Sequence, residues 1–430
     1  MGKSALYLWC AGLAIVTFDL ILTFEFGGFT IKSYYFLFLA AASLFALEEI
    51  RGGRVWDRAR ELFRRPWVFA FLLFAYELGM SPFSYVPKKS FAYSVWLLFD
   101  LVVVALPGYF LLSREIFTSR RVVTFALMAA AYFLVGILIV DLIAFQYGFL
   151  GGFIGYNQEP SLGWGMSRAH AFSFEPSYLS MYFNFSMLFL VGEVISPKPN
   201  IPRIPLFGSV ILLLVGIFLL ASRTGWLLVG TGLAVLLFHS RHLLRRKDLK
   251  KAALGIAAFV VLFLLLLPSK HYSLMGKHLI STILSGTDGS GNTRLKAMNE
   301  AAQISLETKG LGVGVGASFF YYLAKNPALI TPHLHVTMGG ESIMSTWGQI
   351  VAESGLPGTL LYFAFGLSII LALVRAARSS GDATVTASAV SAVLFFGLAA
   401  HLVGNLARTD VWVWFALWMS LTVKTESAHV

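Results

Sequence analysis

The chain has 430 residues, of which 57% are hydrophobic and 13% are charged, and its formal net charge is +11. With a mean hydropathy of +0.74 it has too much apolar surface for a water-soluble domain, so lipid must surround most of it. The positive charges form short clusters between apolar runs, which argues against nucleic-acid binding and is typical of membrane proteins. The single cysteine, Cys10, excludes a disulfide framework within one chain.

The apolar runs predict an all-α, polytopic membrane protein. Each span needs about 20 mostly apolar residues to cross roughly 30 Å of hydrocarbon, and a helix pairs every backbone amide within that layer. A β-barrel would alternate along ten-residue strands, and the run from Ile256 to Pro268 does not alternate. About twelve transmembrane helices are predicted, near residues 5–25, 29–48, 67–82, 91–113, 122–147, 176–195, 207–222, 225–240, 252–268, 353–374, 383–403 and 409–424.

Lysine and arginine predict which ends of these helices lie together. Basic residues concentrate in the connections at residues 49–66, 114–121, 198–203, 241–251 and 375–378. Given about twelve spans, these connections and both termini fall on one side, which the positive-inside rule assigns to the cytoplasm. The first apolar run carries Asp19 and has no convincing cleavage site, so we interpret it as a retained helix.

This orientation leaves two long connections outside, at residues 148–175 and 269–352. The chain is therefore expected to comprise the first nine helices with short loops (1–268), an outer loop domain (269–352) and the last three helices (353–430). A loop of about 80 residues is too long to be a simple turn. We accordingly expect helices within it.

Unusual polar residues gather on the outer side of this arrangement. They are Arg168, His170, Glu175, Arg223, Arg294, His333, His335 and Glu341, with Glu353 and Arg408 on the same side. An arginine near lipid depth usually faces protein or a water-filled cavity, and its planar guanidinium suits phosphate oxygens. Arginines on three separated segments therefore predict a site for an anionic headgroup, such as a lipid-linked pyrophosphate.

The outer loop contains one segment with a helical period, from Leu295 to Leu306, with Asn292 or Thr293 as its expected N-cap. Arg294 would add to the positive end of this helix, where unpaired amides already favour an anion. The glycines that follow, GLGVGVG at 310–316, lack the Lys-Ser/Thr of a phosphate loop and are weak evidence for nucleotide binding.

Each of these polar residues also has a purely structural interpretation. Arg223 could be an interfacial arginine or the partner of an acid, and Arg168 could simply pair with Glu175. Histidines in polar loops, such as His333 and His335, are usually just solvated. The acids in or near the predicted spans are Asp19, Glu77, Asp100, Asp141 and Glu193. Because they are scattered, we interpret them mainly as structural partners.

Four short motifs follow one another between Arg168 and Leu361. They read RAHAFSFEPSYLSMY, ASRTGWLL, GNTRLKAMNEAAQISLETKGLGVGVG and ESGLPG, and they contain Arg168, Arg223, Arg294 and Glu353, respectively. Their order, spacing and sidedness resemble the O-antigen ligase and O-antigen polymerase (Wzy-type) superfamily of membrane glycosyltransferases. The first 150 residues match that superfamily only as a set of hydrophobic helices.

The resemblance implies a metal-independent, GT-C-type transferase that needs no cofactor. Its donor would be a glycan on undecaprenyl pyrophosphate, at the periplasmic face of the bacterial inner membrane. Arg223 and Arg294 would hold the pyrophosphate and stabilise the negative charge on the leaving group. A general base would take a proton from the acceptor hydroxyl, with His335 as the first candidate and Glu341 and Glu175 behind it.

The remaining matched residues would shape the donor or acceptor pocket. Arg168 and Glu175 belong to the first motif together with His170, and His333 lies beside His335 in the outer loop. Many relatives carry a His-Asn pair about nine residues before the glutamate of E-x-G-L-x-G, where this chain has Met344-Ser345. That histidine is expected to be essential in the ligases, which transfer the finished glycan to lipid A core. Its absence in register and the F-E-P-S form of the first motif favour a polymerase of lipid-linked repeat units.

Three alternatives remain beside the polymerase, and one of them is a purely structural membrane subunit. Another is a ligase of the same superfamily. The third is a flippase or transporter for a lipid-linked oligosaccharide, which would place its charges in a central cavity and is commonly built from two related halves. The chain shows no internal repeat, and its unusual charges lie at the outer edge. A complex with a flippase or a chain-length regulator is left open.

Overall fold

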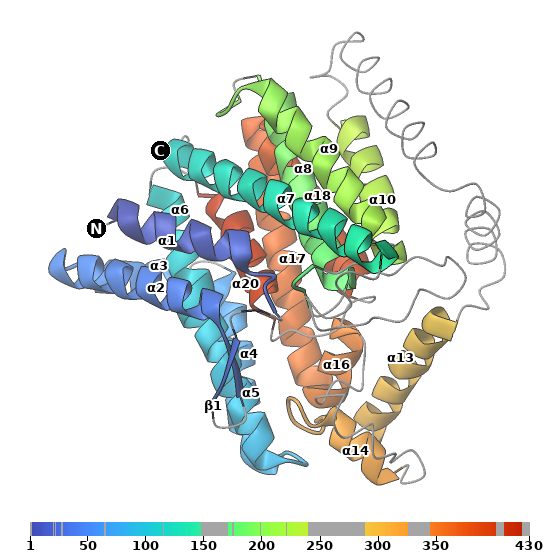
Figure 1. The fold of residues 1–430 in the computed structure, drawn as a ribbon. Coiled ribbons are helices and arrows are strands. Elements are labelled where there is room, and N and C mark those ends of the chain that lie inside the picture. Colours follow the sequence, from blue (N-terminus) through green and yellow to red (C-terminus); the bar gives the residue numbers. More distant parts are fainter. Residues whose placement is uncertain are drawn as a thin grey trace.

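The computed structural model describes residues 2–19, 21, 23–26, 29–63, 66–114, 116–147, 171–173, 176–197, 199–220, 222–239, 289–325, 345–400 and 408–423. Helices dominate these residues (Figure 1). The α-helices are α1 (Gly2–Ile15), α2 (Ser33–Arg51), α3 (Val55–Phe63), α4 (Trp67–Met80), α5 (Pro87–Phe99), α6 (Leu106–Arg114), α7 (Ile116–Tyr147), α8 (Pro176–Ile195), α9 (Arg203–Leu219), α10 (Arg223–His239), α13 (Gly289–Glu307), α14 (Ser318–Lys325), α16 (Thr346–Glu353), α17 (Gly355–Ser380), α18 (Ala383–Leu394) and α20 (Thr409–Ser420). The shorter elements are the 3-10 turn η1 (Ser81–Phe83), the π-helical turns η2 (Asp100–Ala105) and η4 (Phe395–Ala399), and the strands β1 (Thr23–Phe26) and β2 (Phe29–Lys32).

Five helices among the described residues are long and apolar enough to cross a membrane, or six if one bent pair forms a single span. They are Ser33–Arg51, Pro87–Arg114, Thr118–Asp141, Pro176–Ile195 and Gly355–Ser380, and the bent pair joins α3 to Trp67–Phe83. The predicted all-α membrane architecture is therefore confirmed, whereas the number of about twelve spans is not. Three further predicted spans correspond to shorter apolar helices, at Arg203–Leu219, Thr224–His239 and Ala383–Ala399. The predicted span at 252–268 lies outside the described residues.

The segment between α1 and α2 differs from the prediction. The sequence predicts helices at 5–25 and 29–48, but α1 ends at Ile15, and β1 and β2 form an antiparallel hairpin that pairs Thr23 with Lys32. Threonine, phenylalanine and isoleucine in TFEF and FTIK favour extended backbone, and the hairpin pairs amides that the predicted helices would have used internally. The helical conformation predicted for residues 23–25 and 29–32 is therefore wrong, because these residues form strands.

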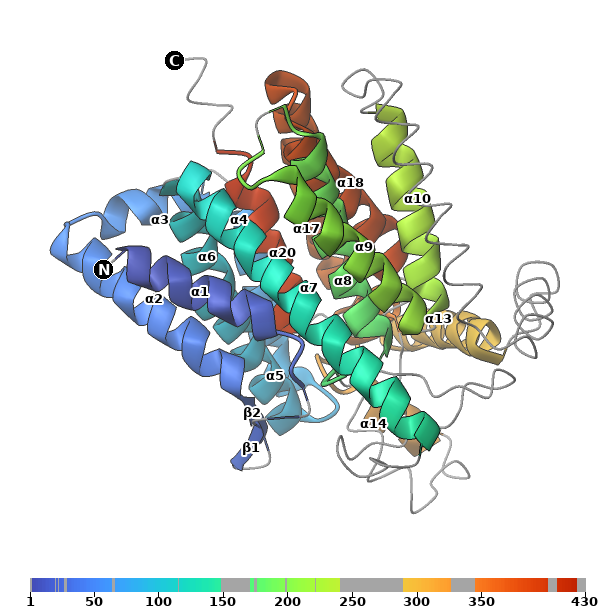
Figure 2. The ribbon, with the colours of Figure 1, turned by 45° about the horizontal axis from the view of Figure 1, so that its top comes forward.

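The bundle has two opposite ends, which we call the hairpin end and the far end (Figures 1 and 2). The hairpin end contains β1 and β2, η1 and α14, together with the starts of α8, α10 and α17. The far end contains α3 and the starts of α7 and α18. Figure 2 shows α3 and α14 well apart, with α7 lying obliquely between α1 and α9.

Helix α8 is the central helix of the bundle. Its membrane-length window is 94% buried inside the protein, against 28–67% for the other candidate spans, so it is lined by helices rather than lipid. It packs against α9, α10 and α18. Glycines allow the close approach, because a Cβ at Gly192 would lie 2.6 Å from the Cα of Thr384 in α18.

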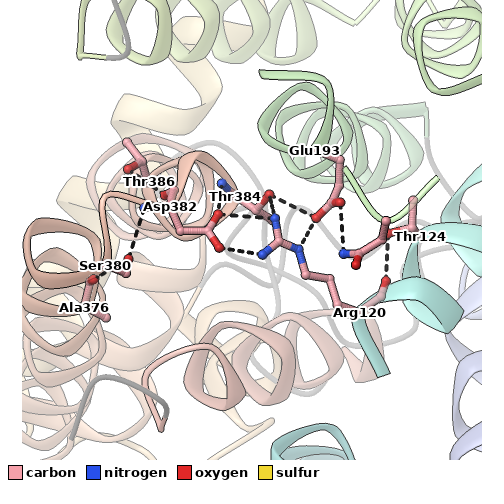
Figure 3. A network of polar contacts seen from close by, with 9 residues as sticks. Arg120, Thr124, Glu193, Ala376, Ser380, Asp382, Thr384 and Thr386 are labelled. Atoms are coloured by element: carbon pink, nitrogen blue, oxygen red, sulfur yellow. Dashed lines mark hydrogen bonds and ion pairs between the residues drawn. The ribbon is translucent and has the colours of Figure 1, made fainter. Parts of the chain in front are cut away.

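A buried ion cluster joins three helices at the far end (Figure 3). The guanidinium of Arg120, in α7, donates to Glu193 at the end of α8 and to Asp382, with an Nη1–Oδ2 distance of 2.5 Å. Asp382 is also the N-cap of α18, accepting from the Thr384 amide at 2.8 Å. Glu193 is completely buried, and Asn200 donates to its second oxygen at 3.2 Å. A charge buried this deeply is tolerated because each carboxylate oxygen has a donor.

We predict that Arg120→Ala lowers the free energy of unfolding by about 3 kcal/mol, because Glu193 would remain buried without a cation. The control is Arg121→Ala, the next residue, which is exposed and should cost no more than about 0.5 kcal/mol. The apparent melting temperature of the purified protein in detergent measures both. Equal shifts for the two variants would contradict the role of the cluster.

Candidate functional site

The side chains of the predicted site residues lie outside the part of the chain that the structure describes. They are Arg168, His170, Glu175, Arg223, Arg294, His333, His335 and Glu341. The backbone is described for two of them: Arg223 is the first residue of α10, and Arg294 lies in the second turn of α13. Their roles remain predictions, and the neighbouring described residues show how the two helices are held.

The first turn of α10 is fixed against the first turns of α8. The Asn184 side-chain amide donates to the Gly225 carbonyl at 3.2 Å and to the Ser180 carbonyl at 2.7 Å. A Cβ at Gly225 would lie 1.8 Å from the Ser180 Oγ, so only glycine permits this approach. The helix beginning at Arg223 and the helix that follows Glu175 therefore start side by side, at the hairpin end.

Helix α13 is held at the same end through Ser345. The single hydrogen of the Ser345 hydroxyl is shared between the Met298 sulfur at 3.4 Å and the Ala400 carbonyl at 3.3 Å, and its oxygen caps α16 by accepting from the Gly348 amide at 3.2 Å. Met298 follows Arg294 by four residues, or about 6 Å along the helix. Ser345 is also the second residue of the Met344-Ser345 pair, so this position has a structural role here.

The helix expected at Leu295 to Leu306 is confirmed, but its predicted N-cap is wrong. Helix α13 begins at Gly289, so Asn292 and Thr293 lie inside it. At its other end, Glu307 accepts hydrogen bonds from Lys325, from the Tyr321 hydroxyl at 2.9 Å and from Gln303 at 3.1 Å. These hydrogen bonds, that of Lys325 first, lower the pKa of Glu307 and attach α14 to α13.

Glu353, from the ESGLPG motif, holds the glycine loop (residues 310–316). Its carboxylate accepts from the Gly316 amide at 2.8 Å, from the Ser318 amide at 3.4 Å and hydroxyl at 2.6 Å, and from the Gln349 side chain at 3.1 Å. Burial raises the pKa of the Glu353 carboxyl, and these donors oppose that rise. Both oxygens are used in structural hydrogen bonds, so Glu353 is a positioning residue for the loop.

The backbone of the glycine loop is bonded to the end of α16. The amide of Val313 donates to the Ala352 carbonyl at 3.0 Å, and that of Gly314 donates to the Glu353 carbonyl at 2.9 Å. All four of its glycines have positive φ, at +80°, +81°, +93° and +72° along the chain. These amides are used within the protein, so they are not available to bind a phosphate group.

Two serines fasten the other side of the glycine loop to η1 and α5. Ser84 Oγ donates to the Val313 carbonyl at 3.0 Å and Ser90 Oγ to the Val315 carbonyl at 2.7 Å, while the Tyr85 amide also donates to Val313 at 2.9 Å. Sequence reasoning treated the glycine loop and the glutamate motif separately. Neither the glycine alternation nor the E-x-G motif contains a signal that connects the two, because the hydrogen bonds between them span more than 30 residues.

A second polar cluster at the hairpin end surrounds Arg408. Its guanidinium donates to Asp410 at 2.9 Å and to Asp19 at 3.3 Å, and it lies 3.7 Å from the ring centroid of Tyr178 in the first turn of α8. Lys32, from β2, also pairs with Asp19. Burial lowers the pKa of Arg408, but Asp410 and Asp19 more than offset it, so the pKa is raised and the cation is retained.

This cluster gives a structural role to Arg408, one of the polar residues that the sequence predicts on the outer side. Arg408 exposes 11% of its side chain and Asp19 only 3%, and each neutralises the other. The interpretation of Asp19 as a structural partner is therefore confirmed. Among the described residues, no group of three or more His, Cys, Asp or Glu side chains could hold a metal ion.

Residues 208–363 match the family described as O-Antigen ligase. This domain match supports the resemblance to the O-antigen ligase and polymerase superfamily. The matched segment contains Arg223, Arg294, the glycine loop and Glu353, but begins after Arg168 and Glu175. None of the curated proteins matches the chain. The matched segment therefore contains α10, α13, the glycine loop and α16.

We predict that Gly314→Ala destabilises the protein more than Gly381→Ala. Both glycines have positive φ, which costs an alanine about 1 kcal/mol. Only at Gly314 would the methyl group collide, 2.2 Å from the Ser84 Oγ, which adds roughly 1–3 kcal/mol of overpacking. At Gly381 a Cβ meets nothing within 4 Å. Melting temperatures that fall equally would contradict the close packing of the glycine loop.

Proposed function

We propose that this chain is a polymerase that joins undecaprenyl-pyrophosphate-linked repeat units of O-antigen or a related surface polysaccharide. The main support is the superfamily match, which spans both arginine-bearing helices. Further support is that the beginning of α10 and the Met298 turn of α13 each make polar contacts at the hairpin end. That common location is what a site shared by Arg223 and Arg294 requires.

In the proposed reaction, an acceptor sugar hydroxyl attacks the anomeric carbon of the donor glycan. The bond between that carbon and the pyrophosphate breaks, a glycosidic bond forms, and undecaprenyl pyrophosphate leaves with the bonding electrons. Arg223 and Arg294 bind the pyrophosphate and stabilise its growing charge. His335 accepts the hydroxyl proton, with Glu341 and Glu175 as alternatives. Arg168, His170 and His333 line the sugar sites.

The proposed setting is the bacterial inner membrane, with both termini cytoplasmic and the site periplasmic. The far end of the bundle carries Arg54, Arg114, Arg120 and Arg378, and basic residues favour the cytoplasmic side. The hairpin end would then face the periplasm, where donors on undecaprenyl pyrophosphate diffuse laterally within the membrane. No soluble nucleotide sugar is needed.

A ligase that transfers the glycan to lipid A core is the second candidate, because the matched family is itself described as O-Antigen ligase. The sequence at Met344-Ser345 favours the polymerase, since the expected histidine of the ligases is replaced in register. The structural use of Ser345 agrees with that replacement.

The deciding experiment supplies the purified protein in nanodiscs with lipid-linked repeat units alone. A ladder of oligomers without any lipid A core supports the polymerase. Product that forms only when lipid A core is added identifies a ligase instead. Movement of the substrate across vesicles without a new glycosidic bond would establish a flippase and refute both transferases.

We predict that Arg223→Ala and Arg294→Ala each reduce turnover at least about 10²-fold, because each removes a donor to the leaving pyrophosphate. Arg375→Ala, an exposed arginine near the end of α17, is the matched control and should retain activity. Lysine at either site keeps the charge but loses the paired donors, so intermediate rates are expected. Normal ladders from either alanine variant would refute the assignment.

We also predict that metal chelation leaves the transfer rate unchanged, because the proposed charge stabilisation comes from guanidinium groups. The assay is repeated with excess EDTA, and then with added Mg²⁺ or Mn²⁺. A rate that depends on either metal would count against the GT-C-type mechanism.

A further inference from the structure

Helix α3 is an amphipathic helix within the basic connection that the sequence predicts only as a loop. Its apolar residues Val55, Ala59, Leu62 and Phe63 fall on one arc of the helix, with Trp56 at its edge. Arg58, Glu61 and Asp57 fall on the opposite arc. None of its residues is buried, so the bundle does not use the whole apolar arc.

The bundle holds only one side of α3. Arg58 pairs with Glu49 at 3.2 Å and lies 5.1 Å from the ring centroid of Phe110, while Glu61 accepts from the Tyr109 hydroxyl at 3.0 Å. Leu62 packs on the hydrophobic core. These contacts fix how α3 is rotated about its axis and determine which residues face outward.

The outward side of α3 is apolar and aromatic. Trp56 is 78% exposed, Phe63 is 72% exposed and Val55 is 46% exposed. The neighbouring Ile50, near the end of α2, is 64% exposed. Side chains of this size are rarely left in water on a rigid helix, and tryptophan is enriched where a membrane meets water.

The axis of α3 is bent by 87° from that of Trp67–Phe83, the apolar helix that follows it. If the second helix crosses the membrane, the first runs nearly parallel to the membrane plane. A short helix with a charged arc and an apolar arc is suited to that position, with the apolar arc in the acyl boundary and the charges at headgroup level.

The charge of the same region indicates which kind of molecule binds the outward side of α3. Residues 48–65 contain six arginines and four acids. Glu48 and Glu49 are already paired with Arg54 and Arg114, and Glu49 also with Arg58. Arg60 is exposed next to the Trp56 edge and makes no ion pair among the residues that the structure describes. A cation beside exposed aromatic side chains is complementary to the phosphate of an anionic lipid.

We propose that α3 is an interfacial anchor that binds anionic phospholipid, with Trp56 and Phe63 in the acyl boundary and Arg60 on the headgroup phosphate. The proposal does not depend on the glycosyl-transfer reaction. It needs only that the apolar helix beginning at Trp67 lies in the membrane. Binding there would fix the depth at which α4 enters the bilayer.

The first test places a fluorophore on the outward side of α3. In a Cys10→Ser background, Trp56→Cys is labelled with a polarity-sensitive dye and reconstituted in nanodiscs containing phosphatidylglycerol. Emission should shift to the blue and be quenched by lipids carrying a nitroxide near the headgroup. Asp57→Cys, one residue and about 100° further round the helix, is the control and should be quenched much less. An unquenched Trp56 label, or equal quenching at both positions, would overturn the proposal.

The second test measures lipid retention by native mass spectrometry. Arg60→Ala should reduce retained phosphatidylglycerol about fivefold and Arg60→Glu more, while leaving phosphatidylcholine retention unchanged. Arg378→Ala removes an exposed arginine from the last turn of α17 and should have little effect. Unchanged retention in Arg60→Glu would refute the lipid site. Protection of the Trp56 label through a dimer in detergent would show that a second copy of the chain covers α3 instead.

Discussion

The carboxylate of Glu353 is the contact on which the position of the glycine loop depends. It accepts hydrogen bonds from both ends of the Gly316–Ser318 segment and from Gln349 within its own helix. Through them the glycine loop is fixed to the end of α16, directly before the long helix α17 begins. Because the glycine loop begins three residues after the end of α13, the same carboxylate also helps to hold the C-terminal end of α13 in place.

The helices that carry Arg294 and Arg223 are positioned by contacts of the same kind. Helix α13 is held at its C-terminal end by the glycine loop and near its middle by the Met298 contact with Ser345. Two fixed points define the axis of a rigid helix, so these contacts also position the backbone of Arg294. The start of α10 is positioned in the same way, by Asn184 and Gly225 against α8. Small side chains and close backbone contacts therefore position the backbone of both arginines.

Much of the fold could be predicted from the sequence because apolar runs directly report burial in lipid or protein. The short helices α4, α9 and α10 were all expected at nearly their observed positions. The hairpin at residues 23–32 was missed because TFEF and FTIK are apolar enough to be read as parts of spans. Helix α3 was missed because its charges matched a basic loop, although its nine residues have a clear helical period.

The candidate site could be predicted less completely, for a different physical reason. Arg223, Arg294 and Glu353 were recognised as significant by residue type and motif, which are local properties. The hydrogen bonds from Gly316 and Ser318 to Glu353 cross more than 30 residues, and the Arg408–Asp19 pair joins nearly the two ends of the chain. Such pairings have no periodic signal in one sequence, so only the three-dimensional structure could reveal them.

These pairings also bear on the identity of the general base. A base must have a free lone pair that can reach the acceptor hydroxyl. At the hairpin end, Glu353 has both oxygens engaged by backbone and side-chain donors, and Asp19 is paired with two cations. Glu307 is held by Lys325 and has a lowered pKa, which makes it a weaker base. These three carboxylates are therefore poor candidates for the base, which is consistent with the proposal that His335, Glu341 or Glu175 takes the proton.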